Sequence, residues 1–253
     1  MIFKNKKVPS SSLKQNFRRG SLGHCIAIIP QMDSFNQVSI SFQEVFNSLS
    51  RERLLPFREK YSSDYEVFKS YCWNIQLSQS LYPLLHFPEV SLRNAIHSAG
   101  CVYFKKKEWI QDEKIIFDPR DIKDISMAIS RFPEGKQKAF YPGDLVAALT
   151  FGFWSGLLKK EYEVLLWHPL IEKVFPNCPS RHRTRKNISI ILNNIRKLRN
   201  RVFHHEPIYN DHALPKTHEQ IYEVLGWVNE NLVIVTRPLD GFIEVYTQGE
   251  KSQ

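Results

Sequence analysis

Apolar residues recur at steps of three and four in two long stretches of this chain, a spacing that places them on one face of an α-helix. The first stretch contains Val67, Phe68, Tyr71, Cys72, Ile75 and Leu81, and the second contains Ile188, Ile191, Leu192, Ile195, Leu198 and Val202. The 253 residues include only 10 glycines, which argues against a sandwich of many short strands joined by tight turns. The sequence therefore predicts an all-α fold.

Caps, prolines and glycines indicate where these helices begin and end. Ser63-Asp64-Tyr65-Glu66 is a capping box, so a helix is expected to start there. Pro83 is expected to end or kink that helix, and a second helix is expected to run from near Pro88 to Gly100. Further helices are predicted over residues 121–129, 144–158 and 161–167.

The first 36 residues differ from the rest of the chain. They contain a run of serines, no clear periodicity and six basic side chains, namely Lys4, Lys6, Lys7, Lys14, Arg18 and Arg19. We interpret residues 1–36 as a basic arm, which is either a loosely docked tail or a clamp for RNA. Residues 37–253 are predicted to form a single all-helical domain.

Several classes of protein are disfavoured by what the sequence lacks. Cys25, Cys72, Cys101 and Cys178 form no CxxC pair, which gives no zinc signature and no disulfide framework. The most apolar segment, residues 145–158, contains two glycines and falls short of the roughly 20 residues that a membrane span needs. There is no glycine-rich phosphate loop, GxSxG or HExxH motif. We expect a cytoplasmic protein with free thiols, no membrane partner and no cofactor.

Positive charge is concentrated in one segment. The net charge is +9, and residues 181–201 contain eight Lys or Arg residues and no acid. Because the second apolar stripe lies in the same segment, one helix face is expected to be buried and the opposite face to be cationic. This face is either an ordinary solvated surface or an interface for an anionic partner, for which RNA is our hypothesis. The RNA-binding candidates are Arg181, Arg183, Arg185, Lys186, Arg196, Lys197, Arg201 and His205.

The same helix is predicted to carry a catalytic group at its end. Arg199 and His204 are five residues apart, about 140° around a helix axis and about 7.5 Å along it. Arginine is a permanent planar cation that binds phosphate, and histidine can move protons near neutral pH. Together with the amide of Asn200, they are sufficient for metal-free RNA cleavage, in which the ribose 2′-hydroxyl attacks its own phosphate. Arg199, Asn200 and His204 are therefore the candidate catalytic residues.

These residues also carry a family resemblance. Arg199-Asn200-x-x-x-His204 matches the R-x4-6-H motif of HEPN ribonucleases, and the run from Leu198 to Ile208 resembles the C-terminal signature of the Abi-like (abortive infection) family. Three further stretches resemble that family in the same order, namely residues 50–54, 89–96 and 149–154. The resemblance spans about residues 50–208.

The resemblance implies a HEPN-type helical bundle with additional helices. It implies a homodimer in which two R-x4-6-H motifs form one composite site. It also implies metal-independent cleavage that leaves a 2′,3′-cyclic phosphate. The expected role is a toxin-like anti-phage effector that a small non-coding RNA binds or controls.

Two neighbouring residues allow more than one interpretation. Glu89 and Arg93 are one helical turn apart, so we predict a structural ion pair. The alternative is a second catalytic site at Arg93-Asn94-Ala95-Ile96-His97, which resembles the main motif with the histidine one residue closer.

The sequence also raises the questions of a metal site and of other functions. His205, Glu206, His212 and His218 match no helical pair of metal ligands, so no metal site is expected. The main alternative function is a catalytically silent, dimeric RNA-binding protein on the same scaffold. A remoter one is a HEPN protein that a nucleotidyltransferase partner modifies.

Overall fold

The computed structural model describes residues 41–112, 114–115, 117–133 and 142–251. The chain divides into two compact units, residues 1–39 and 40–253, and the second contains all the elements described below. The predicted basic arm, residues 1–36, lies outside the described residues. The described part of the chain contains helices and no strand, which confirms the all-α prediction.

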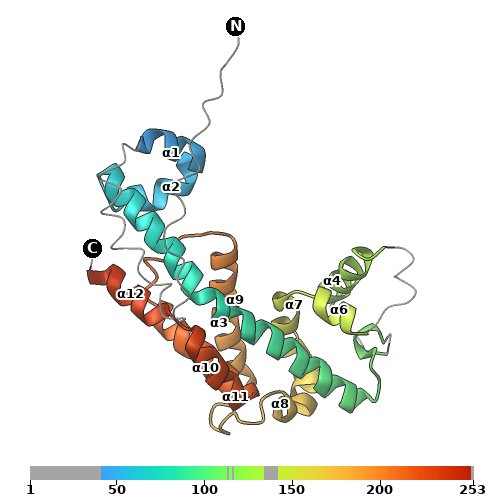
Figure 1. Cartoon of the computed structure of the whole chain (residues 1–253). Coiled ribbons are helices and arrows are strands. Elements are labelled where there is room, and N and C mark those ends of the chain that lie inside the picture. The colour runs from blue at the N-terminus through green and yellow to red at the C-terminus, as the bar shows by residue number, and fades with distance from the viewer. Residues whose placement is uncertain (1–40, 113, 116, 134–141, 252–253) are drawn as a thin grey trace, which may run out of the picture. The chain divides into compact units, whose positions relative to one another are not determined.

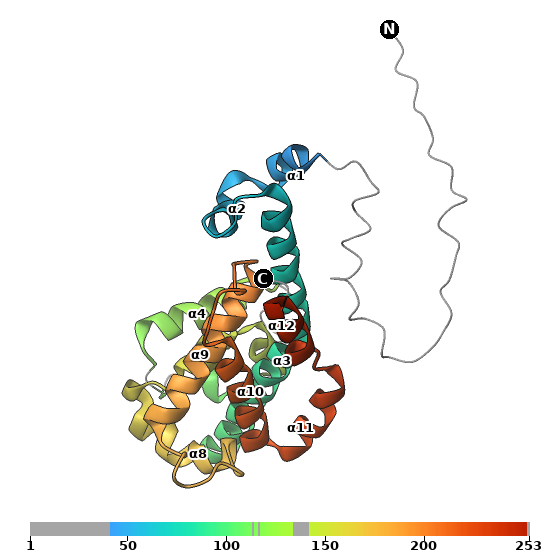
Figure 2. The same cartoon turned by 90° about the vertical axis from the view of Figure 1, so that its left-hand side faces the viewer.

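The described helices pack around one long helix, α3 (Figures 1 and 2). Helices α2, α7, α8, α9, α10 and α12 all contact α3. In chain order the helices are α1 (Phe42–Leu49), α2 (Arg51–Arg58), α3 (Asp64–Phe104), α4 (Pro119–Ser130), α6 (Pro142–Ala148), α7 (Phe151–Gly156), α8 (His168–Val174), α9 (Arg185–Phe203), α10 (Leu214–Val228), α11 (Glu230–Thr236) and α12 (Phe242–Lys251). Short turns of other helix types lie at η2 (Trp109–Gln111), η3 (Lys160–Tyr162), η4 (Glu163–Trp167) and η5 (Arg237–Leu239).

Helix α3 begins at the predicted capping box but does not end where the sequence indicated. The Ser63 hydroxyl accepts a hydrogen bond from the Glu66 backbone N–H at 3.2 Å, as expected for a cap. The helix then continues for 41 residues through Pro83 and Pro88, so the prediction of two separate helices was wrong.

Burial explains why the two prolines do not break α3. A proline in a helix interior costs about 3 kcal/mol. Four leucines around the prolines, Leu81, Leu84, Leu85 and Leu92, are at most 1% exposed. Full burial of each contributes about 1.5–3 kcal/mol, so the four together at least offset the cost of both prolines.

Helix α9 has the predicted amphipathic pattern. All six residues of its apolar stripe, from Ile188 to Val202, are buried. The Thr184 hydroxyl caps its start by accepting from the Asn187 backbone N–H at 3.3 Å. Because the helix begins at Arg185, the predicted RNA-binding residues Arg181 and Arg183 precede it rather than lying on it.

The region between α3 and α9 is more broken than predicted. Helix α4 corresponds to the helix predicted at 121–129. The helix predicted at 144–158 is two helices, α6 and α7, because Thr150 starts a new one by capping the Phe153 N–H at 3.2 Å. The segment 161–167 forms a 3-10 turn followed by a π-helical turn. Among the described helices, none is long and apolar enough to span a bilayer.

Candidate functional site

The guanidinium of Arg199 is held between an acid and an aromatic ring near the end of α9. Its Nε lies 3.1 Å from Oε2 of Glu89, and its Nη2 lies 3.5 Å from Oε1 of the same carboxylate on α3. The guanidinium carbon lies 4.2 Å from the centre of the Phe203 ring, a cation–π contact. The Arg199 side chain remains 26% exposed. It is therefore fixed in position while part of its surface faces solvent.

This arrangement corrects the predicted ion pair between Glu89 and Arg93. Glu89 pairs with Arg199, which is 110 residues away in the chain, and no ion pair joins it to Arg93 among the described residues. The Nε atom of Arg93 is buried and makes no hydrogen bond within the described part of the chain. A one-turn spacing allows a helical pair, but the tighter packing of α9 against α3 gives the carboxylate a different partner.

The histidine of the second motif-like segment belongs to a packed cluster. The His97 ring stacks on Trp109 with the ring centres 6.4 Å apart, and its Nε2 lies 3.4 Å from the Cys101 sulfur. Burial lowers the pKa of His97 below its usual value. These contacts are typical of a structural histidine.

His204 caps α9, and an arginine from α2 holds its backbone. The His204 N–H donates to the Asn200 carbonyl at 2.9 Å, which closes the last turn. Arg53 Nη1 donates to the carbonyls of His204 and His205 at 3.4 and 2.6 Å. His205 has a positive φ of 58°, so the chain turns sharply away from the helix there. The backbone is thereby fixed while the side chains of His204 and His205 remain exposed.

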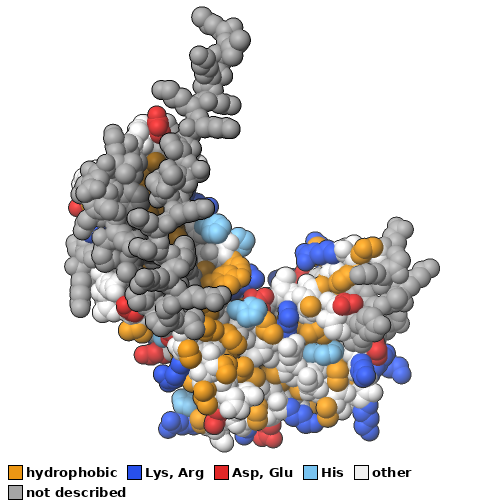
Figure 3. Space-filling model, viewed as in Figure 1, with side chains coloured by type: hydrophobic (Ala, Val, Ile, Leu, Met, Phe, Trp, Pro, Cys, Tyr) orange, Lys and Arg blue, Asp and Glu red, His pale blue; other side chains and the backbone are white. Residues whose placement is uncertain are grey.

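An aromatic surface adjoins Arg199. The rings of Tyr82 on α3 and Phe203 on α9 stack with centres 5.3 Å apart, and Tyr82 is 54% exposed. Exposed His86 follows Tyr82 by one turn of α3 and precedes Glu89 by three residues. Figure 3 shows that the surface is hollowed above the middle of α3, where histidine and basic side chains gather. Exposed aromatic faces beside cations are the elements with which proteins stack nucleic-acid bases.

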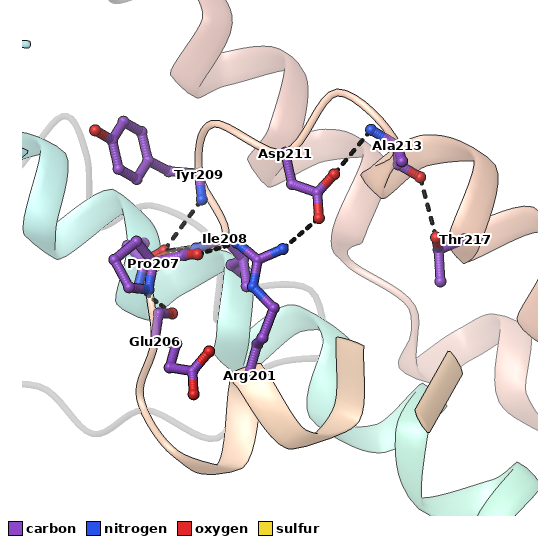
Figure 4. A network of polar contacts seen from close by, with 9 residues as sticks. Arg201, Glu206, Pro207, Ile208, Tyr209, Asp211, Ala213 and Thr217 are labelled. Carbon is purple, nitrogen blue, oxygen red and sulfur yellow. Dashed lines mark hydrogen bonds and ion pairs between the residues drawn. The ribbon is translucent and has the colours of Figure 1, made fainter. Parts of the chain in front are cut away.

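Arg201 is engaged by the loop that follows α9. Figure 4 shows its guanidinium directed at the Asp211 carboxylate and at the Pro207 carbonyl, both of which accept hydrogen bonds from it. Buried Asn74 of α3 fixes the same loop, since its Oδ1 accepts from the N–H groups of Ile208 at 2.6 Å and Tyr209 at 3.1 Å. We therefore reinterpret Arg201, predicted to bind RNA, as an anchor for this loop.

The remaining basic candidates pair with surface acids, contact residues nearby in the chain, or are exposed. Arg183 pairs with Glu172 at 3.2 Å and Arg185 with Glu163 at 3.4 Å, and both acids are more exposed than their arginines. The other contacts join neighbours in the chain, Arg181 Nε to His182 Nε2 at 3.0 Å and Arg196 Nη2 to Asn193 Oδ1 at 2.7 Å. Lys186 and Lys197 are exposed. Of the predicted cationic residues, Arg181, Lys186 and Lys197 are exposed, whereas Arg183 and Arg185 are largely buried and paired with acids.

The residues considered as metal ligands are dispersed. His218 is buried, and its Nε2 lies 2.8 Å from Oδ2 of Asp240, which also accepts from the Tyr222 hydroxyl at 2.8 Å. Burial acts to raise the pKa of Asp240, but these hydrogen bonds and one from the Phe242 N–H lower it below its usual value. His205, Glu206 and His212 are exposed. Within the described residues, no three His, Cys, Asp or Glu side chains gather where they could hold a metal ion.

Sequence reasoning missed the roles of Arg53, Glu89 and the Tyr82–Phe203 pair. Arg53 and Glu89 lie in two of the stretches that carried the family resemblance, and both contact the end of α9. The third stretch also packs against α9. Its Gly152 lies close to Arg196, since a Cβ added to this glycine would be 4.0 Å from Cδ of Arg196. The sequence therefore pointed to the three stretches that contain these residues, but it did not show that all three stretches meet α9.

The arrangement combines a fixed cation, an exposed imidazole and an aromatic surface at one end of α9. Arginine can hold a phosphate, and an exposed histidine is free to exchange protons with solvent or substrate. Asn200 lies between them in sequence, is partly exposed, and makes no side-chain hydrogen bond among the described residues.

The chain was compared with known proteins in three ways. No family model matches it, and neither the curated proteins nor the solved structures include a significant match.

Proposed function

We propose that this chain is a metal-independent endoribonuclease of the HEPN type. Its proposed role is that of a toxin-like abortive-infection effector, controlled by or bound to a small non-coding RNA. The observation that carries the proposal is the fixed guanidinium of Arg199, which stays partly exposed five residues before the exposed His204. Such preorganised cations stabilise negative charge that develops on a phosphate without a cost of reorganisation.

The proposed reaction uses the chain's own residues. The ribose 2′-hydroxyl attacks the adjacent phosphorus and the bond to the 5′-oxygen of the next nucleotide breaks. The 2′-hydroxyl loses its proton and the leaving 5′-oxygen gains one, and His204 carries out at least one of these two transfers. Arg199 stabilises the charge on the non-bridging oxygens. The products are a 2′,3′-cyclic phosphate and a 5′-hydroxyl end. The stacked Tyr82 and Phe203 rings offer a platform for a base next to the cleaved bond.

The active form is proposed to be a homodimer. His204 lies just beyond the last helical residue, and among the described residues no hydrogen bond or ion pair joins its side chain to Glu89 or Arg199. Two antiparallel copies across a two-fold axis would bring Arg199 of each chain toward His204 of the other, an isologous arrangement.

The decisive experiment is cleavage of an unstructured RNA in EDTA, with analysis of the product ends. We expect cyclic-phosphate products from the parent and a loss of about 100-fold or more in His204→Ala, given the usual contribution of general acid–base catalysis. His212→Ala is the matched control, because His212 is also exposed and lies in the loop that follows. Equal activity in the two variants, or 3′-hydroxyl products, would contradict the mechanism.

The shared site is tested in the same assay by mixing two inactive chains. Arg199→Ala and His204→Ala chains together are expected to regain activity, because each heterodimer keeps one Arg199 and one His204 on facing chains. A chain that stays monomeric by light scattering and cleaves at a concentration-independent specific rate would refute the composite site.

One observation favours the alternative of a catalytically silent, dimeric RNA-binding protein. The Glu89 carboxylate offsets part of the positive charge of Arg199, which weakens its attraction for phosphate. That alternative predicts salt-dependent RNA binding by the parent, with no cleavage that depends on His204.

A further inference from the structure

A polar pocket lies between α7 and α9, separate from the Arg199 site. Its volume is about 370 Å³. Its polar wall is formed by Ser155 and Lys159 on one side and by Ser189, Asn193 and Arg196 on the other. Gly156, at the end of α7, also lines it. No carboxylate is among the lining residues.

The charges around this pocket favour an anion. Arg196 Nη2 donates to the Asn193 Oδ1 at 2.7 Å, which orients the guanidinium and leaves its other N–H groups without a hydrogen bond among the described residues. Lys159 Nζ lies 3.0 Å from Oδ2 of Asp121, which is 8% exposed and does not line the pocket. Because Asp121 balances much of the charge of Lys159, Arg196 supplies most of the positive potential in the pocket.

The residues of α9 that line the pocket lie on the same face of the helix as Asn200, one of the candidate catalytic residues. Ser189, Asn193, Arg196 and Asn200 follow one another at steps of three and four, so they share one face of the helix. Arg196 is only four residues, about 6 Å, before Asn200 along the axis. A nucleic-acid strand that occupies the Arg199 site can therefore place a neighbouring phosphate at the pocket.

We propose that this pocket is a phosphate-binding site. Arg196 and the hydroxyl of Ser189 supply hydrogen-bond donors to the phosphate oxygens, and Lys159 adds charge at the rim. The Ser155 hydroxyl donates to the Gly152 carbonyl at 3.3 Å and lines the pocket beside them. The phosphate belongs either to an RNA strand, next to the cleaved bond, or to a free nucleotide. The RNA form of this inference rests on the proposed function, whereas the nucleotide form does not.

A glycine in the wall allows the pocket to be filled without disturbing the fold. An added Cβ on Gly156 would meet no atom within 4 Å, so a leucine fits at this lining position without a clash at Cβ. Gly143 on α6 has the same freedom and is exposed, but it does not line the pocket. Gly156→Leu is thus the test variant and Gly143→Leu its matched control.

The experiment measures binding of two probes to the full chain, an unstructured RNA oligonucleotide and adenosine monophosphate. We expect Gly156→Leu to weaken binding of at least one probe by about tenfold, as for the loss of one hydrogen bond to a charged group. Gly143→Leu should bind as the parent does. Loss for RNA alone identifies a backbone phosphate, and loss for the nucleotide identifies a free ligand.

Unchanged binding of both probes by a folded Gly156→Leu chain overturns the proposal. If that variant does not fold, Arg196→Met removes the charge while keeping an unbranched side chain, and the same two outcomes apply to it. Cleavage that depends on His204 is measured separately. Failure of the phosphate-site proposal can therefore be told apart from failure of the ribonuclease proposal. A pocket-dependent loss of binding in a chain that never cleaves RNA would support the site and contradict the enzyme.

Discussion

The two ends of α9 are equally basic in sequence and differ in how the fold uses their charge. At the N-terminal end, Arg183 just before the helix and Arg185 at its start pair with acids that are 74% and 38% exposed, and Lys186 is exposed. At the C-terminal end, Arg199 and Arg201 pair with acids that are only 21–28% exposed. The arginine side chains are partly buried at both ends, at 20–31% exposed, so the ends differ in how exposed the partner acids are.

This difference shows that a run of basic residues does not by itself indicate a binding surface. Ion pairs with a solvated acid contribute little to stability, so an anionic partner can displace these acids at the N-terminal end at low cost. At the C-terminal end, the acids that hold Arg199 and Arg201 are themselves largely buried, so these ion pairs are part of the structure that holds the site. The comparison predicts that stability depends on the C-terminal end and that salt-dependent RNA binding depends on the N-terminal end.

The largest expected effect on stability is at Asn74, which fixes the loop after α9. Asn74→Ala leaves the buried N–H groups of Ile208 and Tyr209 without an acceptor and should lower the free energy of unfolding by about 3 kcal/mol. Asn94→Ala is the control, because Asn94 lies on the same helix but is exposed. Urea denaturation of both variants measures the difference. Similar urea midpoints for the two variants would show that Asn74 does not hold the loop after α9.

A smaller effect is expected at Glu89, where a double-mutant cycle identifies its partner. Glu89→Gln should lower the free energy of unfolding by about 1 kcal/mol, since the pair with Arg199 is partly exposed. Coupling of about 1 kcal/mol is expected between Glu89→Gln and Arg199→Met. A cycle with Arg93→Met serves as the comparison and should show little coupling. Coupling of Glu89 to Arg93 and not to Arg199 would support the Glu89–Arg93 ion pair that the sequence predicted.

The smallest effect on stability is expected at the N-terminal end. Replacing Arg183, Arg185 and Lys186 with alanine should change the free energy of unfolding by less than about 1 kcal/mol. The same change should flatten the slope of log affinity for single-stranded RNA against log salt by about 2, at roughly 0.7 for each phosphate contact. The control removes three exposed lysines, Lys105, Lys106 and Lys107, with the same change in net charge. Equal slopes for the two variants would show that net charge, not this surface, governs binding.

Local patterns in the sequence were sufficient to predict several features. The steps of three and four between apolar residues predicted the helical class and the buried face of α9, from Ile188 to Val202. The Ser63–Glu66 capping box predicted the start of α3. These predictions succeed because helix geometry and capping involve residues within one or two turns of each other. The assignment of Arg199, Asn200 and His204 to catalysis stays a prediction.

Features that involve distant segments were decided only by the tertiary structure. Pro83 and Pro88 have the local signature of a helix end, and it was the burial of the neighbouring leucines that kept α3 continuous. Glu89 had Arg93 one turn away, but the packing of α3 on α9 placed Arg199 against its carboxylate. Arg53 donates to the carbonyl of His205, two residues past the end of α9, across 152 residues of sequence. The sequence supplied the charged groups, and the free energy of packing determined which of them meet.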